Sequence, residues 1–214
     1  LGHSVLPNTL IQFMAEHPRV TLSFTEGLTE TISESVANGQ LDLAFINRPT
    51  RPTGLAIEHV IQEEVVLVSS HNTPMNIADR IGLDEVKDRS FIMPTKSHGL
   101  RQLIARALSK SNFSIIPVLE IDSFIAIATL VNEGPYLTFF PEDIVRNLKC
   151  RASIDLRTHH LIEPAMHREI VCATNPRRPL SPAAEKLSTA LISAICKAHA
   201  SIQANPDARP ASTS

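Results

Sequence analysis

Hydrophobic and polar positions change their period several times along the chain, and each change marks an expected element. Apolar residues recur every three to four positions in five stretches, which predicts helices with one buried face over 5–16, 29–38, 100–108, 124–133 and 180–200. Alternating or continuous apolar runs predict strands at 20–24, 41–46, 55–61, 63–70, 91–95, 116–121, 136–141, 153–162 and 169–174. A short helix is expected over 142–148, and Asn38-Gly39 is typical of a helix end.

Strands alternating with helices predict an α/β fold in which helices cover both faces of a parallel or mixed sheet. Two such series are separated by a loop-rich stretch, so we expect two Rossmann-like lobes joined by crossing strands. Lobe I is predicted to comprise residues 1–70 and 173–202, lobe II residues 71–172, and residues 203–214 a disordered tail. A cleft between two such lobes is a common place for a small ligand.

The composition of the chain narrows the range of possible functions. The net charge of −2 leaves no basic excess with which this segment could grip nucleic acid. Cys150, Cys172 and Cys196 are odd in number and widely spaced, which argues against a disulfide framework and for a reducing compartment. No apolar run approaches the ~18 residues that a membrane span needs. We therefore expect a cytoplasmic protein, and the opening of the chain directly into a helix suggests a piece of a longer polypeptide.

The stretch PTKSHG precedes the helix at 100–108 and gathers Thr95, Lys96, Ser97 and His98. Hydroxyls, a cation and an imidazole at a helix N-terminus can bind a small anion, although Ser97 or Thr95 could simply cap the helix. No Walker, GxGxxG, GxSxG, HExxH or CxxC sequence is present, so the sequence predicts no cofactor, no metal and no enzyme.

A second polar group lies in the first lobe. Thr29 starts a predicted helix, and Asn47 and Arg48 follow the buried strand at 41–46. Ligands bind beyond the carboxyl ends of such strands, so these residues could face 95–98 across the cleft. Helix capping by Thr29 alone and a solvated Arg48 remain alternatives. Two helix N-termini together with Lys96 favour an anionic ligand, such as a small carboxylate.

The sequence resembles the effector-binding domain of LysR-type transcriptional regulators over nearly its whole length. The resemblance is carried by LGHSVLPNTLIQFMAEHPRVTLSFTEGLTETISESVANGQLDLAFI, MPTKSHGLRQLIARAL, EIDSFIAIATLVNEGPYLTFFP and RRPLSPAAEKL. It implies a fold like that of type 2 periplasmic binding proteins and a cytoplasmic regulator that touches DNA only through an N-terminal winged helix-turn-helix absent from this chain. It also implies a ligand site at Thr29, Asn47 and 95–98, with hinges near Val68-Ser69 and 172–174.

The resemblance further implies a homodimer or homotetramer, in which the first helix of one copy packs against the helix at 124–133 of another. Ile11 and Ile125 lie beside the main apolar stripes of these helices, so each helix has a second surface to bury. The chain departs from the family at Gly134-Pro135-Tyr136, where relatives have a glycine-rich loop. A solute-binding protein of a transport system and a cytosolic enzyme on the same fold are the alternative functions.

Overall fold

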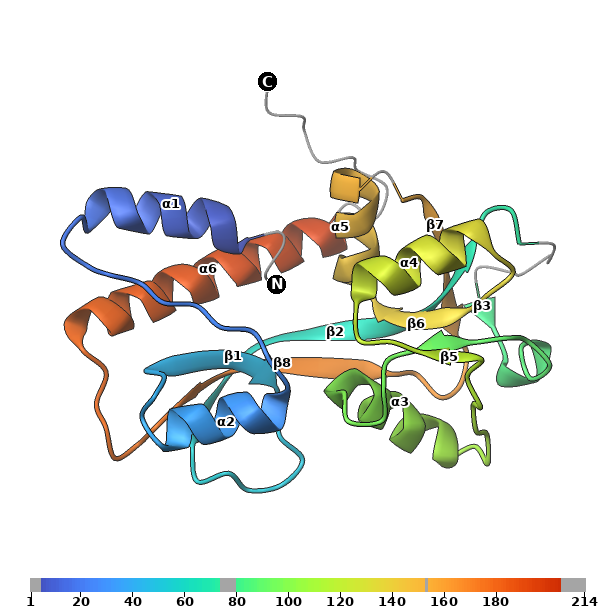
Figure 1. The fold of residues 1–214 in the computed structure, drawn as a ribbon, viewed down its shortest axis with the longest axis horizontal. Helices are drawn as coiled ribbons and strands as arrows, with labels where there is room; N and C mark the ends of the chain where they lie inside the picture. The colour runs from blue at the N-terminus through green and yellow to red at the C-terminus, as the bar shows by residue number, and fades with distance from the viewer. Residues whose placement is uncertain (1–4, 74–79, 153, 205–214) are drawn as a thin grey trace. The chain divides into compact units, whose positions relative to one another are not determined.

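The computed structural model describes residues 5–73, 80–152 and 154–204 of the chain. The helices are α1 (Leu6–Glu16), α2 (Thr29–Ala37), α3 (Gly99–Ser109), α4 (Phe124–Glu133), α5 (Glu142–Ala152) and α6 (Pro182–Ala204), with a 3₁₀ turn at Leu83–Glu85. The strands are β1 (Leu43–Asn47), β2 (Ala56–Ser70), β3 (Arg80–Ile81), β4 (Ile92–Met93), β5 (Leu119–Glu120), β6 (Thr138–Pro141), β7 (Leu156–Leu161) and β8 (His167–Thr174) (Figure 1).

The chain divides into two compact units. Unit 1 consists of the chain up to Gln62 and of the described residues from Glu169 onward, and Glu63–Arg168 form unit 2. The chain therefore leaves unit 1 inside β2 and returns to it inside β8. These boundaries fall earlier in both strands than the lobe boundaries expected from the sequence, at 70 and 172.

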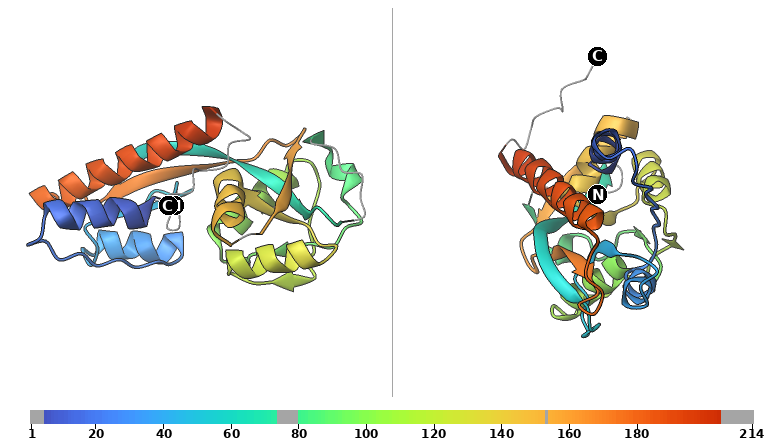
Figure 2. Two further views of the ribbon diagram at one scale, coloured as in Figure 1. Left: turned by 90° about the horizontal axis from the view of Figure 1, so that it is seen from above. Right: turned by 90° about the vertical axis from the view of Figure 1, so that its left-hand side faces the viewer.

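In unit 1, the strand order is β1-β8-β2, and β1 pairs antiparallel with β8 from Leu43↔Thr174 to Asn47↔Ile170. Successive residues of β1 point to opposite faces. Ala44 and Ile46 pack with α2, whereas Leu43 and Phe45 pack on the side of α6. The helix α1 lies along α6 (Figure 2). Helices thus cover both faces of this small sheet, as the sequence predicted.

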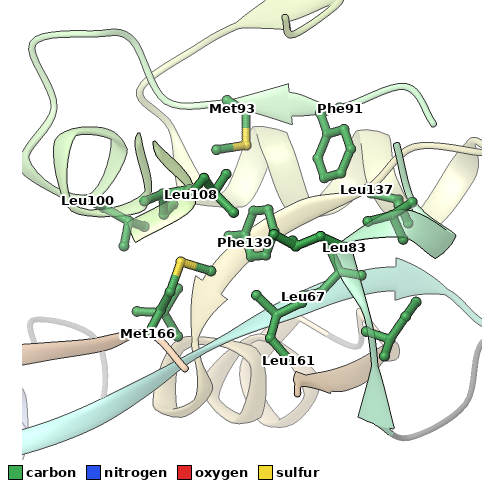
Figure 3. Close-up of a cluster of buried hydrophobic side chains, with 14 residues drawn as sticks. Leu67, Leu83, Phe91, Met93, Leu100, Leu108, Leu137, Phe139, Leu161 and Met166 are labelled. Carbon is green, nitrogen blue, oxygen red and sulfur yellow. The ribbon is translucent and has the colours of Figure 1, made fainter. Parts of the chain in front are cut away.

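In unit 2, the second half of β2 pairs antiparallel with β6 and with β7, and β7 pairs parallel with β3. Successive side chains of β2 point to opposite faces of the sheet, so they enter two separate hydrophobic clusters. Leu67 packs in a cluster with the apolar side chains of α3, and Figure 3 shows Phe139 in the middle of this cluster. Val66 and Val68 enter the other cluster, which is closed by α4 and α5.

Most helices begin and end close to the predicted positions, but several strands differ. The strand expected at 20–24 is wrong, because residues 20–28 form no strand in the structure. Val20 and Leu22 instead pack, partly buried, against the cluster of α1 and α6. The two strands expected over 55–70 are one continuous strand, β2.

Other elements differ mainly in length. The strand expected at 116–121 is reduced to β5, and α5 runs on to Ala152. Of the expected tail, residues 205–214 lie outside the described residues, and 203–204 end α6. Among the helices that the structure describes, none is long and apolar enough to cross a membrane.

Two of the cysteines can be compared with the expectation of free thiols. Cys172 is buried in the unit 1 sheet and Cys196 is partly buried on α6, and both are free. Burial raises the pKa of the Cys172 thiol, which makes it a weak nucleophile. The side chain of Cys150 lies outside the described part of the structure.

Candidate functional site

The clearest functional arrangement in unit 2 lies where β4 and β5 end. These strands pair parallel, with Ile92↔Leu119 and Met93↔Glu120 in register, so their carboxyl ends meet at one edge. The helices α3 and α4 begin a few residues beyond that edge, at Gly99 and Phe124. The carboxyl edge of parallel strands, with two helix N-termini beside it, is the usual position of a ligand in an α/β sheet.

Thr95 is held at this edge by Asp122. The backbone N–H of Thr95 donates to Asp122 Oδ1 at 2.9 Å, and its hydroxyl donates to Asp122 Oδ2, also at 2.9 Å. Thr95 Oγ1 lies 3.0 Å from Ser97 Oγ. Asp122, Lys96 and Ser97 are exposed and Thr95 is half-buried, so a small molecule can reach the cluster.

His98, not Ser97 or Thr95, caps α3, which corrects the capping expectation. Its Nδ1 accepts a hydrogen bond from the backbone N–H of Leu100 at 3.2 Å. The rings of His98 and of Phe124 in α4 are in edge-to-face contact, with their centroids 5.4 Å apart. Because the imidazole takes the capping role, the hydroxyls of Thr95 and Ser97 do not cap α3 and instead contact Asp122 and each other.

The predicted residues of unit 1 behave differently from one another. Thr29 is the first helical residue of α2 and Leu28 occupies the cap position, so the prediction that Thr29 caps this helix is wrong. Asn47 ends β1, and its buried Oδ1 has no hydrogen-bond partner among the described residues.

Arg48 is exposed to solvent, as the alternative expected, but its side chain is paired. Its Nε donates to Glu169 Oε2 at 2.6 Å, while His59 Nδ1 lies 2.7 Å from Glu169 Oε1. The hydrogen bond from Arg48 lowers the pKa of the Glu169 carboxyl, so this pair stays ionised at neutral pH. An effector could use only the guanidinium nitrogens that Glu169 leaves available.

The structure therefore brings residues 95–98 together within unit 2, and Asn47 and Arg48 lie next to each other in unit 1. The prediction that both groups contact one ligand stays a prediction. Sequence reasoning missed Asp122 and Glu169. For Asp122 a signal was present in the sequence, since an acidic residue stands between a strand and a helix.

Two other features of the described residues bear on the chemistry. No group of three His, Cys, Asp or Glu side chains within them could hold a metal ion. A surface hollow of about 520 Å³ lies between β2 and α6 in unit 1 and is lined by residues such as Glu58, Ser188 and Ile192. It includes none of the predicted ligand residues.

This two-unit α/β arrangement, with polar residues at the carboxyl ends of its strands, is that of a small-molecule-binding domain. The family model described as the LysR substrate binding domain matches residues 1–195, and the chain belongs to this family. The resemblance noted in the sequence is confirmed. Domains of this family are parts of transcriptional regulators rather than enzymes, as the sequence predicted.

Among curated proteins, the chain is similar to the HTH-type transcriptional activator CmpR of Synechocystis sp., with 26% identity over 62% of this chain and 44% of CmpR. It is also similar to the nitrogen assimilation regulatory protein nac of Escherichia coli, with 23% identity over 85% of this chain and 58% of that protein. The chain thus spans about half the length of the curated relatives it matches.

Among solved structures, the fold is similar to the effector-binding domain of QuiR in complex with shikimate, with a TM-score of 0.77 and 23% identity over 92% of both chains. It is also similar to the regulatory domain of CcmR from Synechocystis PCC6803 in complex with 2-PG, with a TM-score of 0.78 and 18% identity over 90% of this chain and 91% of that one. These likenesses confirm the predicted fold class.

Proposed function

We propose that this chain is the effector-sensing part of a cytoplasmic LysR-type transcriptional regulator, which touches DNA through a winged helix-turn-helix outside these residues. Binding of a small molecule would change how that segment engages DNA. The family match and the regulators among the relatives support this function over a solute-binding protein of a transport system.

The observation that carries the proposal is the polar cluster at the carboxyl edge of β4 and β5, where α3 and α4 begin. An acid group of the effector would be held by Lys96 and by the first-turn N–H groups of α3 that are not bonded to His98. Ser97 and His98 would line the same place. That QuiR is bound to shikimate, a hydroxylated carboxylic acid, is in keeping with an acidic effector here.

Within unit 1, we propose that Asn47 contributes to ligand binding. A buried acceptor without a donor is destabilising by about 1–3 kcal/mol, and a ligand donor to Asn47 Oδ1 would remove that penalty. For Thr29 and Arg48 the proposal rests on the family resemblance. The ion pair with Glu169 makes Arg48 a positioning group as much as a ligand contact.

The test is a thermal-shift screen of small carboxylates and phosphates, followed by calorimetry with the best ligand. Lys96→Ala should weaken binding roughly tenfold or more, because a hydrogen bond to a charged group contributes about 1.5–3 kcal/mol. Ser97→Ala and Thr95→Val should also weaken binding, because they break the hydrogen-bonded cluster that these residues form with Asp122. Lys87→Ala is the matched control, since Lys87 is an exposed lysine of unit 2 that is not among the residues of the cluster. Unchanged affinity in all three variants would remove the site assignment.

We also propose that the protein is a homodimer or homotetramer. The exposed apolar residues Ile11 and Met14 on α1 and Ile125 on α4 support an interface that uses these two helices. On the basis of the family, we propose DNA contact and a cytoplasmic location as well.

A further inference from the structure

The hydroxyl groups of Thr95 and Ser97 form a hydrogen-bonded relay with a fixed direction. An ionised carboxylate can only accept hydrogen bonds, so Thr95 Oγ1 donates its single proton to Asp122 Oδ2. Thr95 Oγ1 then has only lone pairs left for its 3.0 Å contact with Ser97. Ser97 must be the donor in that contact, and both hydroxyl protons point toward Asp122.

This direction determines what the cluster offers a ligand. Ser97 Oγ presents its lone pairs outward, and each oxygen of the exposed Asp122 carboxylate has a further lone pair. The backbone N–H of Thr95 is already bonded to Asp122. The hydroxyl end of the cluster therefore accepts hydrogen bonds, although the sequence suggested that it would donate them to an anion.

Asp122 holds Thr95 in place, but the neighbouring helix start and strand pair do not account for its carboxylate. The cap of α4 is Ser123, whose hydroxyl accepts from the N–H of Ala126 at 3.3 Å. The strands β4 and β5 are held by their own ladder and by the hydrogen bond from the N–H of Ile121 to the carbonyl of Met93. Neither the helix start nor the strand pair requires a carboxylate at position 122.

We propose that Asp122 is a specificity-determining residue, which selects effectors that carry a hydroxyl or ammonium donor beside their acid group and excludes compact, acceptor-only anions. This inference rests on the proposed function. The donor of the effector binds at Asp122 and Ser97, while the acid group binds at Lys96 and the start of α3. Hydroxy acids and amino acids are the ligand classes that fit both halves of the site.

Asp122→Asn tests the relay directly, with sulfate as the probe. An amide NH₂ can donate to Thr95 Oγ1, which reverses the relay and leaves the Ser97 proton free to point outward. Sulfate should then bind at least tenfold tighter than to the wild type, as measured by NMR titration of the amide signals of residues 95–99. Asp122→Ala removes the carboxylate altogether and should change sulfate binding in the same direction.

Two comparisons make the result specific. Asp88→Asn removes a charge from an exposed aspartate of unit 2 and should leave sulfate affinity at the wild-type level. Ser97→Ala in the Asp122→Asn background should abolish the gain. A gain below tenfold in both Asp122 variants, an equal gain in Asp88→Asn, or a gain that survives Ser97→Ala would each overturn the proposal.

A comparison of glycolate with acetate tests donor selectivity, because the two ligands differ by one hydroxyl. The wild type should bind glycolate at least threefold tighter than acetate, and Asp122→Asn should lose this preference. A smaller preference, or no measurable glycolate binding, counts against donor selection. Neither outcome depends on the effector screen, so the regulator function can stand while this inference fails, and the reverse.

Discussion

At the scale of single residues, the least ordinary group is a buried carboxylate at the start of unit 2. Glu63 Oε2 accepts a hydrogen bond from Arg168 Nε at 2.8 Å, and Arg168 Nη2 lies 2.8 Å from the same oxygen in an ion pair. Asp143 Oδ1 lies 3.4 Å from the same guanidinium. Burial, together with the nearby charge of Asp143, raises the pKa of Glu63 to about 7 against the attraction of Arg168. Two carboxylates share one arginine, so a proton is retained near neutral pH.

This arrangement makes stability depend on pH. Between the ordinary glutamate pKa near 4.5 and the folded value near 7, the folded state binds more protons than the unfolded one. The free energy of unfolding should therefore fall as pH rises through this window, by up to about 3 kcal/mol, and level off above it. Glu63→Gln should lose this part of the slope, measured by urea unfolding from pH 5 to pH 8.

The control is Glu133→Gln, which changes an exposed glutamate of unit 2 and should keep the wild-type slope. Because Glu63→Gln lacks the titrating group, its stability relative to the wild type should improve as pH rises. Parallel stability curves for Glu63→Gln and the wild type would show that Glu63 does not bind the proton.

Also at this scale, the sequence revealed residues 95–98 because they are adjacent polar residues before a helical stripe. The partner of Thr95 was not visible, since Asp122 is 27 positions away and reaches Thr95 only through the pairing of β4 with β5. The cap was assigned to a hydroxyl because Ser and Thr are the common choices. In this loop, Asp122 binds Thr95, and His98 has the cap position.

At the scale of elements, the helices were predicted well because the apolar stripe of a helix and the residues at its ends are local features of the sequence. The end of α2 is an example, since Asn38-Gly39 was expected to close it and Gly39 adopts φ 71°. The strand at 20–24 failed because an alternating pattern forms a strand only where a neighbouring strand supplies hydrogen bonds. In unit 1, those residues instead pack under α1 and α6.

The end of α2 also allows a prediction about Gly39. Its carbonyl accepts from Arg178 Nη1 at 2.9 Å, and a Cβ at this position would overlap the Arg178 guanidinium. Gly39→Ala should therefore lower the free energy of unfolding by about 1–2 kcal/mol for the left-handed backbone, and by a further ~1 kcal/mol for the displaced arginine. Chemical denaturation measures the sum.

Gly54→Ala is the matched control for this effect. Gly54 has the same φ of 71°, but a Cβ there would meet nothing within 4 Å. It should show the backbone penalty alone. Equal losses in the two variants would mean that the contact of Arg178 with Gly39 adds nothing to stability.

At the scale of the whole molecule, repeated strand-helix alternation was enough to predict two α/β units. The boundaries were harder to predict, because β2 is one strand from Ala56 to Ser70 and its hydrophobic pattern does not change where it passes from unit 1 to unit 2. The pattern did indicate surfaces that a single copy leaves open. Ile11 is 64% exposed and Ile125 is 51% exposed, whereas Ile127 on the same helix as Ile125 is fully buried.

Ile125 therefore does not lie in the core of the single chain, and an interface between copies is the use we propose for it. If α1 of one copy packs against α4 of another, the contact occurs twice in a symmetric dimer, so one substitution affects it twice. Ile125→Glu and Ile11→Glu would each bury two unpaired carboxylates, and we expect dimerisation to weaken at least a hundredfold. Light scattering should show monomers, while thermal melting should show a transition within a few degrees of the wild type.

Ile162→Glu separates this effect from a general effect of surface charge. Ile162 is also an isoleucine of unit 2, 56% exposed, but it follows β7 and belongs to neither helix. That variant should remain dimeric, because the substituted carboxylate stays in water. Loss of the dimer in Ile162→Glu as well, or a wild-type chain that is monomeric at high concentration, would contradict an interface made by α1 and α4. If Ile125→Glu unfolded, the result would assign Ile125 to the core, because the fold depends only on side chains that are needed inside their own unit.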